Sequence, residues 1–280
     1  MPALPRGRGS LRPYSLMTLP PLAVLTRPAG RNDALAQALR AEGWDVLDLP
    51  ALRIVPLPAD ADTLARPQGH DLAVFVSGTA ARLYLGQLRD VAGMQQWPAE
   101  VAAACVGPGT ARALRDSPLW NPAAELLHPG PQDGSYDSEA LWQILQERGL
   151  RPRRVLLVRG TAGRDWLAGR LAGQGAQVLP YAVYAREPAP WPAAAVAALA
   201  ARRDAGGQAH WLVTSGEGLA ALREQARQAG LLAWWLGCRF VATHPRLAER
   251  LAAEDGAPAP GMVKICLPED AAIVQAFRSR

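Results

Sequence analysis

The sequence predicts an α/β protein with two similar lobes, each a parallel sheet flanked by helices. Two observations support this fold class: short apolar runs alternate with amphipathic stretches from Leu22 onward, and one long segment recurs later in the chain. Apolar strands that alternate with helices are typical of a parallel sheet covered on both faces. The predicted strands, in chain order, are Leu22–Thr26, Val46–Leu49, Leu72–Ser77, Val101–Val106, Val155–Arg159, Gln177–Leu179, Trp211–Thr214, Phe240–Thr243 and Val263–Leu267.

The predicted helices carry an apolar stripe on one face. Apolar residues recur every three or four positions over Asp33–Glu42 and again over Arg164–Gly173, which is the spacing of one helix face. A last helix is predicted over Glu269–Phe277. Each of these helices therefore has one side suited to packing on a sheet.

An internal repeat indicates that the lobes are copies of one unit. Residues 24–58 and 156–190 are identical at eleven of thirty-five positions when shifted by 132. Two later pairs match with a small drift: FVSGTAARL with LVTSGEGLAAL, and CVGPGTARAL with VATHPRLAERL. A self-match at a fixed period means two copies of one supersecondary unit. We therefore expect two lobes with a ligand cleft between them.

Residue usage excludes several kinds of site. Lys264 is the only lysine, and the chain has no Gly-Lys-Ser/Thr phosphate-binding loop. A Schiff-base mechanism would have to use Lys264, which lies in a predicted buried strand. The three cysteines lie far apart, and the four histidines include no HExxH motif. These features argue against a disulfide framework and a metal site, and they fit a reducing cytoplasm.

The charge distribution argues against nucleic-acid binding. The net charge is +5, but residues 1–16 contain three arginines and no acid, so the rest of the chain carries only +2. A dense basic patch is therefore not expected. Residues 1–21 are rich in Pro, Gly and Arg and are predicted to be a disordered tail, which a translation start at Met17 would largely remove. Leu16–Leu25 is too short and too proline-broken to span a membrane.

Polar turns follow the predicted strands and recur in both lobes. Three kinds of turn each occur twice: 26–28 with 158–160, 76–79 with 214–216, and 107–110 with 243–246. Ser, Thr and Gly at such turns expose hydroxyl and backbone N–H groups, and the helix dipole favours an anion there. Ordinary N-capping is the alternative for any single turn. The recurrence favours an anion-lined cleft with the candidate residues Arg27, Ser77, Gly78, Thr79, Gly107, Gly109, Thr110, Arg159, Gly160, Ser215, Gly216 and Thr243.

Two copies of an extended segment are candidates for a hinge. GAQVLPYAVYAREPAP at 175–190 is the second copy of GWDVLDLPALRIVPLP at 43–58. If the two cross between the lobes side by side, residues 53–56 and 182–187 form a two-stranded hinge. Tyr184 and Arg186 then lie where the lobes meet. The alternative is that Tyr184 is a packing residue with its hydroxyl in water.

The ordered series of turns resembles the uroporphyrinogen-III synthase family. The match covers Leu22 to the C-terminus and rests on VLTRPAG (24–30), FVSGTA (75–80), VGPGTARAL (106–114), RVLLVRGTAGR (154–164), VLPYAVYAR (178–186), LVTSGEGL (212–219) and VATHPRLAERL (241–251). The resemblance implies that the first lobe is discontinuous. It then consists of residues 22–52 and 188–280, and the second lobe of residues 57–181.

The resemblance also implies an activity. The family cyclises hydroxymethylbilane, a linear tetrapyrrole with acetate and propionate arms, inverting the last ring and losing water. It implies a lyase without metal or organic cofactor, acting as a monomer on a small molecule, with no nucleic-acid or membrane partner. Because closure without inversion competes, the enzyme must hold the chain in a productive geometry.

The family's positions assign roles to particular residues. They assign carboxylate contacts to the turns at Ser77–Gly78, Gly109–Thr110 and Ser215–Gly216. Tyr184 matches the family's tyrosine and is expected to donate a hydrogen bond to the departing hydroxyl. Ala185 departs from the pattern, since a bulkier polar residue is usual there.

A non-catalytic ligand sensor or binding module of the same fold is the alternative function. Such a relative is expected to carry an extra DNA-binding or membrane segment. The last predicted helix ends close to Arg280, so no such segment is expected here.

Overall fold

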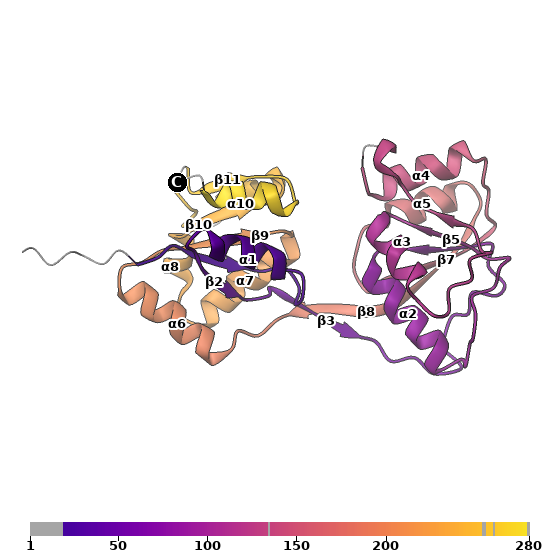
Figure 1. The fold of residues 1–280 in the computed structure, drawn as a ribbon, viewed down its shortest axis with the longest axis horizontal. Coiled ribbons are helices and arrows are strands. Elements are labelled where there is room, and N and C mark those ends of the chain that lie inside the picture. Colours follow the sequence, from indigo (N-terminus) through magenta and orange to yellow (C-terminus); the bar gives the residue numbers. More distant parts are fainter. Residues whose placement is uncertain (1–18, 134, 254–255, 260, 279–280) are drawn as a thin grey trace, which may run out of the picture. The chain divides into compact units, whose positions relative to one another are not determined.

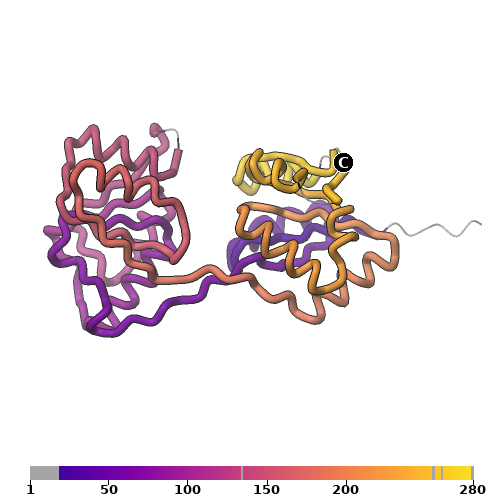
Figure 2. Tube along the Cα trace, turned by 180° about the vertical axis from the view of Figure 1, so that it is seen from behind, coloured from indigo at the N-terminus to yellow at the C-terminus, as the bar shows by residue number. Residues whose placement is uncertain are grey.

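The structure is a computed structural model that describes residues 19–133, 135–253, 256–259 and 261–278. Most of the predicted tail, residues 1–18, lies outside the described residues. The chain divides into two compact units: unit 1 comprises Met1–Leu52 and Pro188–Arg280, and unit 2 comprises Arg53–Glu187. Figure 2 shows the indigo and the orange-to-yellow segments of unit 1 folded together, although they are far apart in sequence.

Unit 1 contains a five-stranded parallel sheet in the order β11-β10-β9-β1-β2 (Figure 1). One face packs on α1 and α10 through a core that includes Leu25, Leu39 and Phe277. The other face packs on α6, α7, α8 and α9 through a core that includes Trp211 and Trp235. The bounds are β1 (Leu22–Leu25), α1 (Asp33–Ala41), β2 (Asp45–Asp48), α6 (Ala193–Asp204), β9 (Ala209–Val213), α7 (Gly216–Gln228), α8 (Leu232–Leu236), β10 (Arg239–Ala242), α9 (Pro245–Ala252), β11 (Val263–Ile265) and α10 (Asp270–Arg278).

Unit 2 contains a six-stranded sheet in the order β3-β8-β7-β4-β5-β6. The pairs from β8 to β6 are parallel. Ala73 and Phe75 of β4 face α2 and α3, whereas Leu72 and Val74 face α4 and α5, because successive side chains of a strand point to opposite faces. The bounds are β3 (Leu52–Pro56), β4 (Leu72–Phe75), α2 (Gly78–Asp90), β5 (Ala102–Cys105), α3 (Pro108–Arg115), β6 (Leu126–Leu127), the 3₁₀ helix η1 (Pro131–Asp133), α4 (Ser138–Glu147), β7 (Arg154–Gly160), α5 (Trp166–Gly173) and β8 (Gln177–Pro188).

The α/β class with parallel sheets flanked by helices is confirmed. The strand orders β11-β10-β9-β1-β2 and β6-β5-β4-β7-β8 correspond strand by strand under the sequence repeat. The repeated sequence therefore folds into the same supersecondary arrangement in each unit. The central strands β1 and β4 are buried on both faces, which explains why they are apolar along their length, whereas the edge strand β2 begins and ends with an exposed aspartate.

Two strands differ from the sequence-based expectation. The predicted strand Gln177–Leu179 continues as β8 to Pro188, so the expected hinge segment 182–187 is part of one long strand. The other expected hinge segment, 53–56, lies in β3. β6 was not predicted, because two residues are too few to show a periodic pattern. No helix in the described part of the chain combines the length and the apolar character needed to cross a membrane.

Candidate functional site

Two of the predicted turns join a buried strand to a helix in unit 2. Ser77 follows β4 in an extended conformation, and its Oγ accepts a hydrogen bond from the N–H of Ala80 at 3.1 Å. This is an N-cap, and Ser77 can be an N-cap whether or not the turn also binds an anion. Capping uses the hydroxyl only as an acceptor, and its own O–H remains available to donate. Gly107 occupies the same position before α3, where Pro108 supplies the first helical residue.

The N-termini of α2 and α3 lie close together. A methyl group on Gly78 would lie 3.5 Å from the carbonyl oxygen of Gly109 and 3.5 Å from Cβ of Ala113. Gly109 is exposed and Thr79 is half-buried, whereas Thr110 is buried. Two positive helix ends at one edge of a sheet favour an anion, which backbone N–H groups can bind. Thr110 therefore contributes more to packing than was expected.

A β-bulge aims the predicted catalytic tyrosine. Arg159 pairs with Ala182, but the next residue, Gly160, pairs with Tyr184, so Val183 is the extra residue of β8. Val183 and Tyr184 are consecutive, yet both belong to the core that packs on α2 and α3, so they face the same side of the sheet, which regular alternation would not allow. Bulges beside functional sites commonly redirect a side chain in this way.

The side chain of Tyr184 lies over Gly160 and reaches the Ser77 turn. A methyl group on Gly160 would lie 2.7 Å from Cε2 of Tyr184, and the tyrosine Oη lies 3.5 Å from Oγ of Ser77. Tyr184 is only 2% exposed and belongs to the core of unit 2, so it packs as the alternative expected, but its hydroxyl lies beside Ser77 and not in water. Arg186, which is exposed, places its guanidinium carbon 5.9 Å from the centre of this ring.

Two of the three arginines predicted to bind substrate, Arg27 and Arg159, are held in ion pairs of their own units, and the third is Arg186. Nη1 of Arg159 is bonded to Asp165, and its Nε donates to the carbonyl of Gly160 at 3.2 Å. The equivalent Arg27 places Nη1 2.5 Å from Oδ1 of Asp270. Each ion pair therefore fixes the arginine side chain at the end of its strand.

The turns of unit 1 repeat the pattern. Ser215 caps α7, and its Oγ accepts from the N–H of Gly218 at 3.0 Å, as Ser77 does in unit 2. Gly216 and Thr243 are half-buried, and His244 caps α9 with its ring nitrogen.

Arg250 was not predicted from the sequence and lies directly over one of these turns. A methyl group on Gly216 would lie 1.9 Å from Nη1 of Arg250, so the glycine leaves the space that the guanidinium occupies. Arg250 is exposed, and among the described residues it forms no ion pair. Both α3 and α9 begin at a proline, and counted from this proline the residue equivalent to Arg250 is Ala113. In the register that pairs 107–110 with 243–246 it is Leu114, so the other copy has no charge in either case, and that contrast is the signal that sequence reasoning missed.

Arg82 lies in a similar place in unit 2. Its Nη1 would be 3.4 Å from a methyl group on Gly78. The aligned repeat has Ala220 at this position. Each unit thus supplies one arginine over its Ser-Gly turn, but from positions that are not equivalent.

Burial shifts the pKa values of several titratable groups that have no proposed role at these turns. Burial raises the pKa of Cys105 to about 11 and that of Cys238 to about 11, so neither is a thiolate at neutral pH. Burial, and then the charge of Arg239, lowers the pKa of His210 to about 4. Within the described ranges, no three His, Cys, Asp or Glu side chains gather where they could hold a metal ion.

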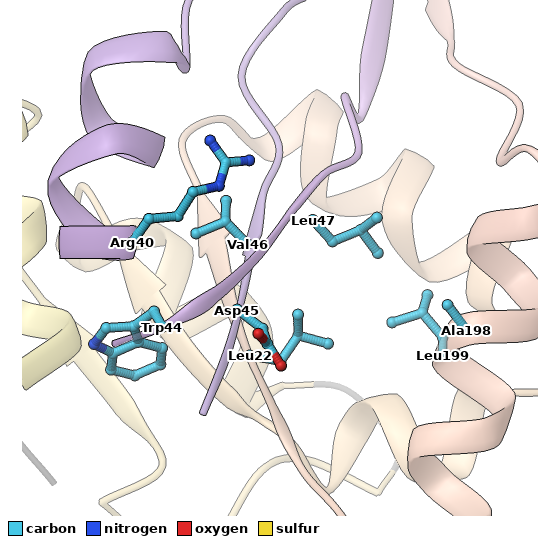
Figure 3. A pocket seen from close by; sticks show the side chains of 8 residues that line it. All are labelled: Leu22, Arg40, Trp44, Asp45, Val46, Leu47, Ala198 and Leu199. Carbon is cyan, nitrogen blue, oxygen red and sulfur yellow. The ribbon is translucent and has the colours of Figure 1, made fainter. Parts of the chain in front are cut away.

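A separate pocket of about 420 Å³ lies at the edge strand β2 of unit 1 (Figure 3). Arg40 of α1, Trp44 and Asp45 border it together with aliphatic side chains of β1, β2 and α6. None of the predicted site residues lines it, so it is not part of the candidate site.

Comparisons with known proteins agree on one family. The sequence model of the family described as uroporphyrinogen-III synthase HemD matches residues 33–259. The uroporphyrinogen-III synthase of Salmonella typhimurium LT2 is 30% identical over 228 residues, which are 80% of this chain and 88% of that protein. The uroporphyrinogen-III synthase of Escherichia coli K12 is 30% identical over 245 residues, which are 83% and 91% of the two chains.

Two solved structures share the fold. A mutant uroporphyrinogen III synthase from the extremely thermophilic bacterium Thermus thermophilus has a TM-score of 0.54 and 19% identity, covering 92% of this chain and 97% of that one. The uroporphyrinogen-III synthetase of Helicobacter pylori 26695 has a TM-score of 0.54 and 14% identity, with 92% and 97% coverage. These two likenesses show the α/β architecture alone.

Proposed function

Because this chain belongs to the uroporphyrinogen-III synthase family, we propose that it cyclises hydroxymethylbilane, inverting the terminal pyrrole ring and releasing water as a lyase. The observation that carries the proposal is the group formed by Tyr184, Ser77 and the adjoining N-termini of α2 and α3. All of these residues lie within the part of the chain that the family model matches.

Carboxylate arms of the substrate are proposed to bind at the turns. Ser77–Gly78 and Gly109 offer backbone N–H groups at two adjoining helix ends of unit 2, and Ser215–Gly216 offers them in unit 1. Pro108 has no N–H, and the N–H of Thr110 donates to the carbonyl of Gly107 at 3.1 Å. The capping serines can add a hydroxyl donor, because their oxygens accept from the helix and their protons remain free. Arg82 and Arg250 add positive charge over the two Ser-Gly turns.

Tyr184 is proposed to assist the leaving hydroxyl. Its Oη lies 3.5 Å from the Ser77 hydroxyl, so a substrate hydroxyl bound at this turn comes within reach of the phenol. A hydrogen bond to the departing oxygen stabilises the charge that develops on it. The pyrrole nitrogen supplies the electron pair that expels the hydroxyl, so the proposed reaction needs neither a metal nor an organic cofactor.

The contribution of the protein is then mainly positional. Spontaneous ring closure joins the ends of the chain without inversion, so the bound geometry must select the carbon of the terminal ring that forms the new bond. We propose that the protein acts in this way as a monomer in the cytoplasm, on a free small molecule rather than on nucleic acid or a membrane.

The test is a product assay. Freshly prepared hydroxymethylbilane is mixed with the purified protein, the products are oxidised to porphyrins, and the type I and type III isomers are separated by chromatography. The proposal predicts the type III isomer. A non-catalytic binding module would yield only the type I isomer at the rate of the protein-free control, and that result would overturn the proposal.

A further inference from the structure

Tyr136 is an exposed aromatic residue at the same edge of unit 2. It precedes Asp137, which caps α4 by accepting from the N–H of Ala140 at 2.8 Å. Tyr136 is 52% exposed, whereas Tyr184 is 2% exposed. Tyr136 therefore presents far more of its surface to a ligand than Tyr184 does.

The side chain of Tyr136 packs directly against Gly107. A methyl group on Gly107 would lie 3.0 Å from Cβ of Tyr136, 3.5 Å from Cγ and 3.6 Å from Cδ1. The φ angle of Gly107 is 171°, an extended conformation that any residue can adopt, so the backbone does not require glycine here. The close approach of Tyr136 would make a methyl group here a tighter contact than usual, so Tyr136 would have to shift slightly to admit one. One side of Tyr136 is thus packed against the helix cap, and the rest of the ring faces solvent.

Tyr136 extends the group of candidate residues along the sheet edge. The strands β7, β4 and β5 are parallel neighbours, so their carboxyl ends lie at one edge. Along this edge, Tyr184 covers Gly160 after β7, the Ser77 turn follows β4, and Tyr136 covers Gly107 after β5. The two helix N-termini therefore lie between two tyrosines.

We propose that the ring of Tyr136 stacks on a pyrrole ring of the substrate whose carboxylate arms are bound at the N-termini of α2 and α3. This inference rests on the proposed function and adds a specific contact to it. A linear tetrapyrrole carries its acidic arms directly on its rings, so a ring lies within a few bonds of every bound carboxylate. A half-exposed aromatic side chain beside the anion site matches that chemistry, because stacking buries apolar surface of both rings.

The test compares three variants with the wild type in two assays. Tyr136→Ala is expected to raise KM for hydroxymethylbilane about fivefold and to leave kcat within about twofold, since one aromatic contact is lost. Tyr136→Phe keeps the ring and is expected to behave like the wild type. Leu179→Ala is the control, because Leu179 is a large hydrophobic residue of unit 2 that is 46% exposed but lies toward the start of β8.

A binding assay separates this inference from the proposed function. Titration with uroporphyrin III, a stable octacarboxylate, is expected to give a Kd about fivefold higher for Tyr136→Ala than for the wild type or Tyr136→Phe. The Kd values can be compared whether or not the wild type turns over hydroxymethylbilane. If the protein binds uroporphyrin III but shows no activity, that result contradicts the proposed function and not the role of Tyr136.

Two results would overturn the inference. One is a Tyr136→Ala variant that unfolds at the same temperature as the wild type and binds uroporphyrin III with an unchanged Kd. The other is a Kd in Tyr136→Phe raised as much as in Tyr136→Ala, because the hydroxyl rather than the ring would then make the contact.

Discussion

Gly160→Ala tests whether the position of Tyr184 controls catalysis. The added methyl group would lie 2.7 Å from Cε2, 2.9 Å from Cζ and 3.3 Å from Cδ2 of the tyrosine ring. Non-bonded carbon atoms prefer about 3.5–4.0 Å, so the ring must move by about 1 Å. The φ angle of Gly160 is not positive, so alanine brings no backbone strain of its own.

The expected loss follows from this displacement. The Tyr184 Oη, now 3.5 Å from the Ser77 hydroxyl, would move away from the position proposed for the leaving group. A misplacement of about 1 Å can cost about a hundredfold in rate, so kcat is expected to fall by about ten- to a hundredfold. Overpacking of the core is expected to lower the free energy of unfolding by about 1–3 kcal/mol.

The assay is the initial rate of type III isomer formation, with thermal unfolding measured on the same samples. Gly169→Ala is the matched control, because Gly169 lies within α5 and a methyl group there meets no atom within 4 Å. This control is expected to keep full activity and to gain about 0.5–1 kcal/mol of stability. Combining Gly160→Ala with Tyr184→Phe should add little further loss. A kcat within twofold of the wild type in Gly160→Ala would refute the reasoning.

Three further predictions concern binding, pH and reactivity. Arg250→Ala is expected to raise KM for hydroxymethylbilane about fivefold, because the substrate loses a charge-assisted hydrogen bond. The control is Arg227→Ala, which should change KM by less than twofold, because Arg227 is paired with Glu224 at 2.7 Å. Equal effects of the two substitutions would show that Arg250 does not belong to the site. The lowered pKa of His210, about 4 against 6.5, means that the unfolded chain binds the extra proton, so stability is lost as the pH falls from 6.5 toward 4. His210 is partly exposed, so the expected effect is reduced accordingly. Urea unfolding should show that the free energy of unfolding falls by about 1 kcal/mol between pH 7 and pH 5, and that this fall is absent in His210→Asn. Cys105 and Cys238 should react with a thiol reagent at pH 8 only at the rate of unfolding, and rapid labelling of either would contradict their raised pKa.

Local sequence patterns were sufficient for the elements and the capped turns. Ser77 and Ser215 are N-caps because short polar side chains after an apolar strand satisfy the first helix N–H groups, and this depends on neighbouring residues alone. The repeat accounts for the matching strand orders of the two sheets, because equivalent sequences fold alike, but it does not predict the order itself.

Long-range packing decided what the patterns missed. Proline at position 180 suggested the end of a strand, but β8 pairs with β7 through this residue and beyond it. The bulge beside Gly160 depends on how two distant strands pair, and no local pattern encodes it. Arg250 and Tyr136 reach the turns from other elements, so only the folded chain brings them to Gly216 and Gly107.

The central claim is that binding in one geometry makes the inverted ring closure faster than the spontaneous one. Its most direct measurement is the type III share of the product from a fixed amount of hydroxymethylbilane as the protein concentration is increased. The account predicts that this share rises from near zero without protein to nearly all of the product, while the substrate half-life shortens in proportion. A share that stays near zero, or a half-life that does not change with added protein, would contradict it.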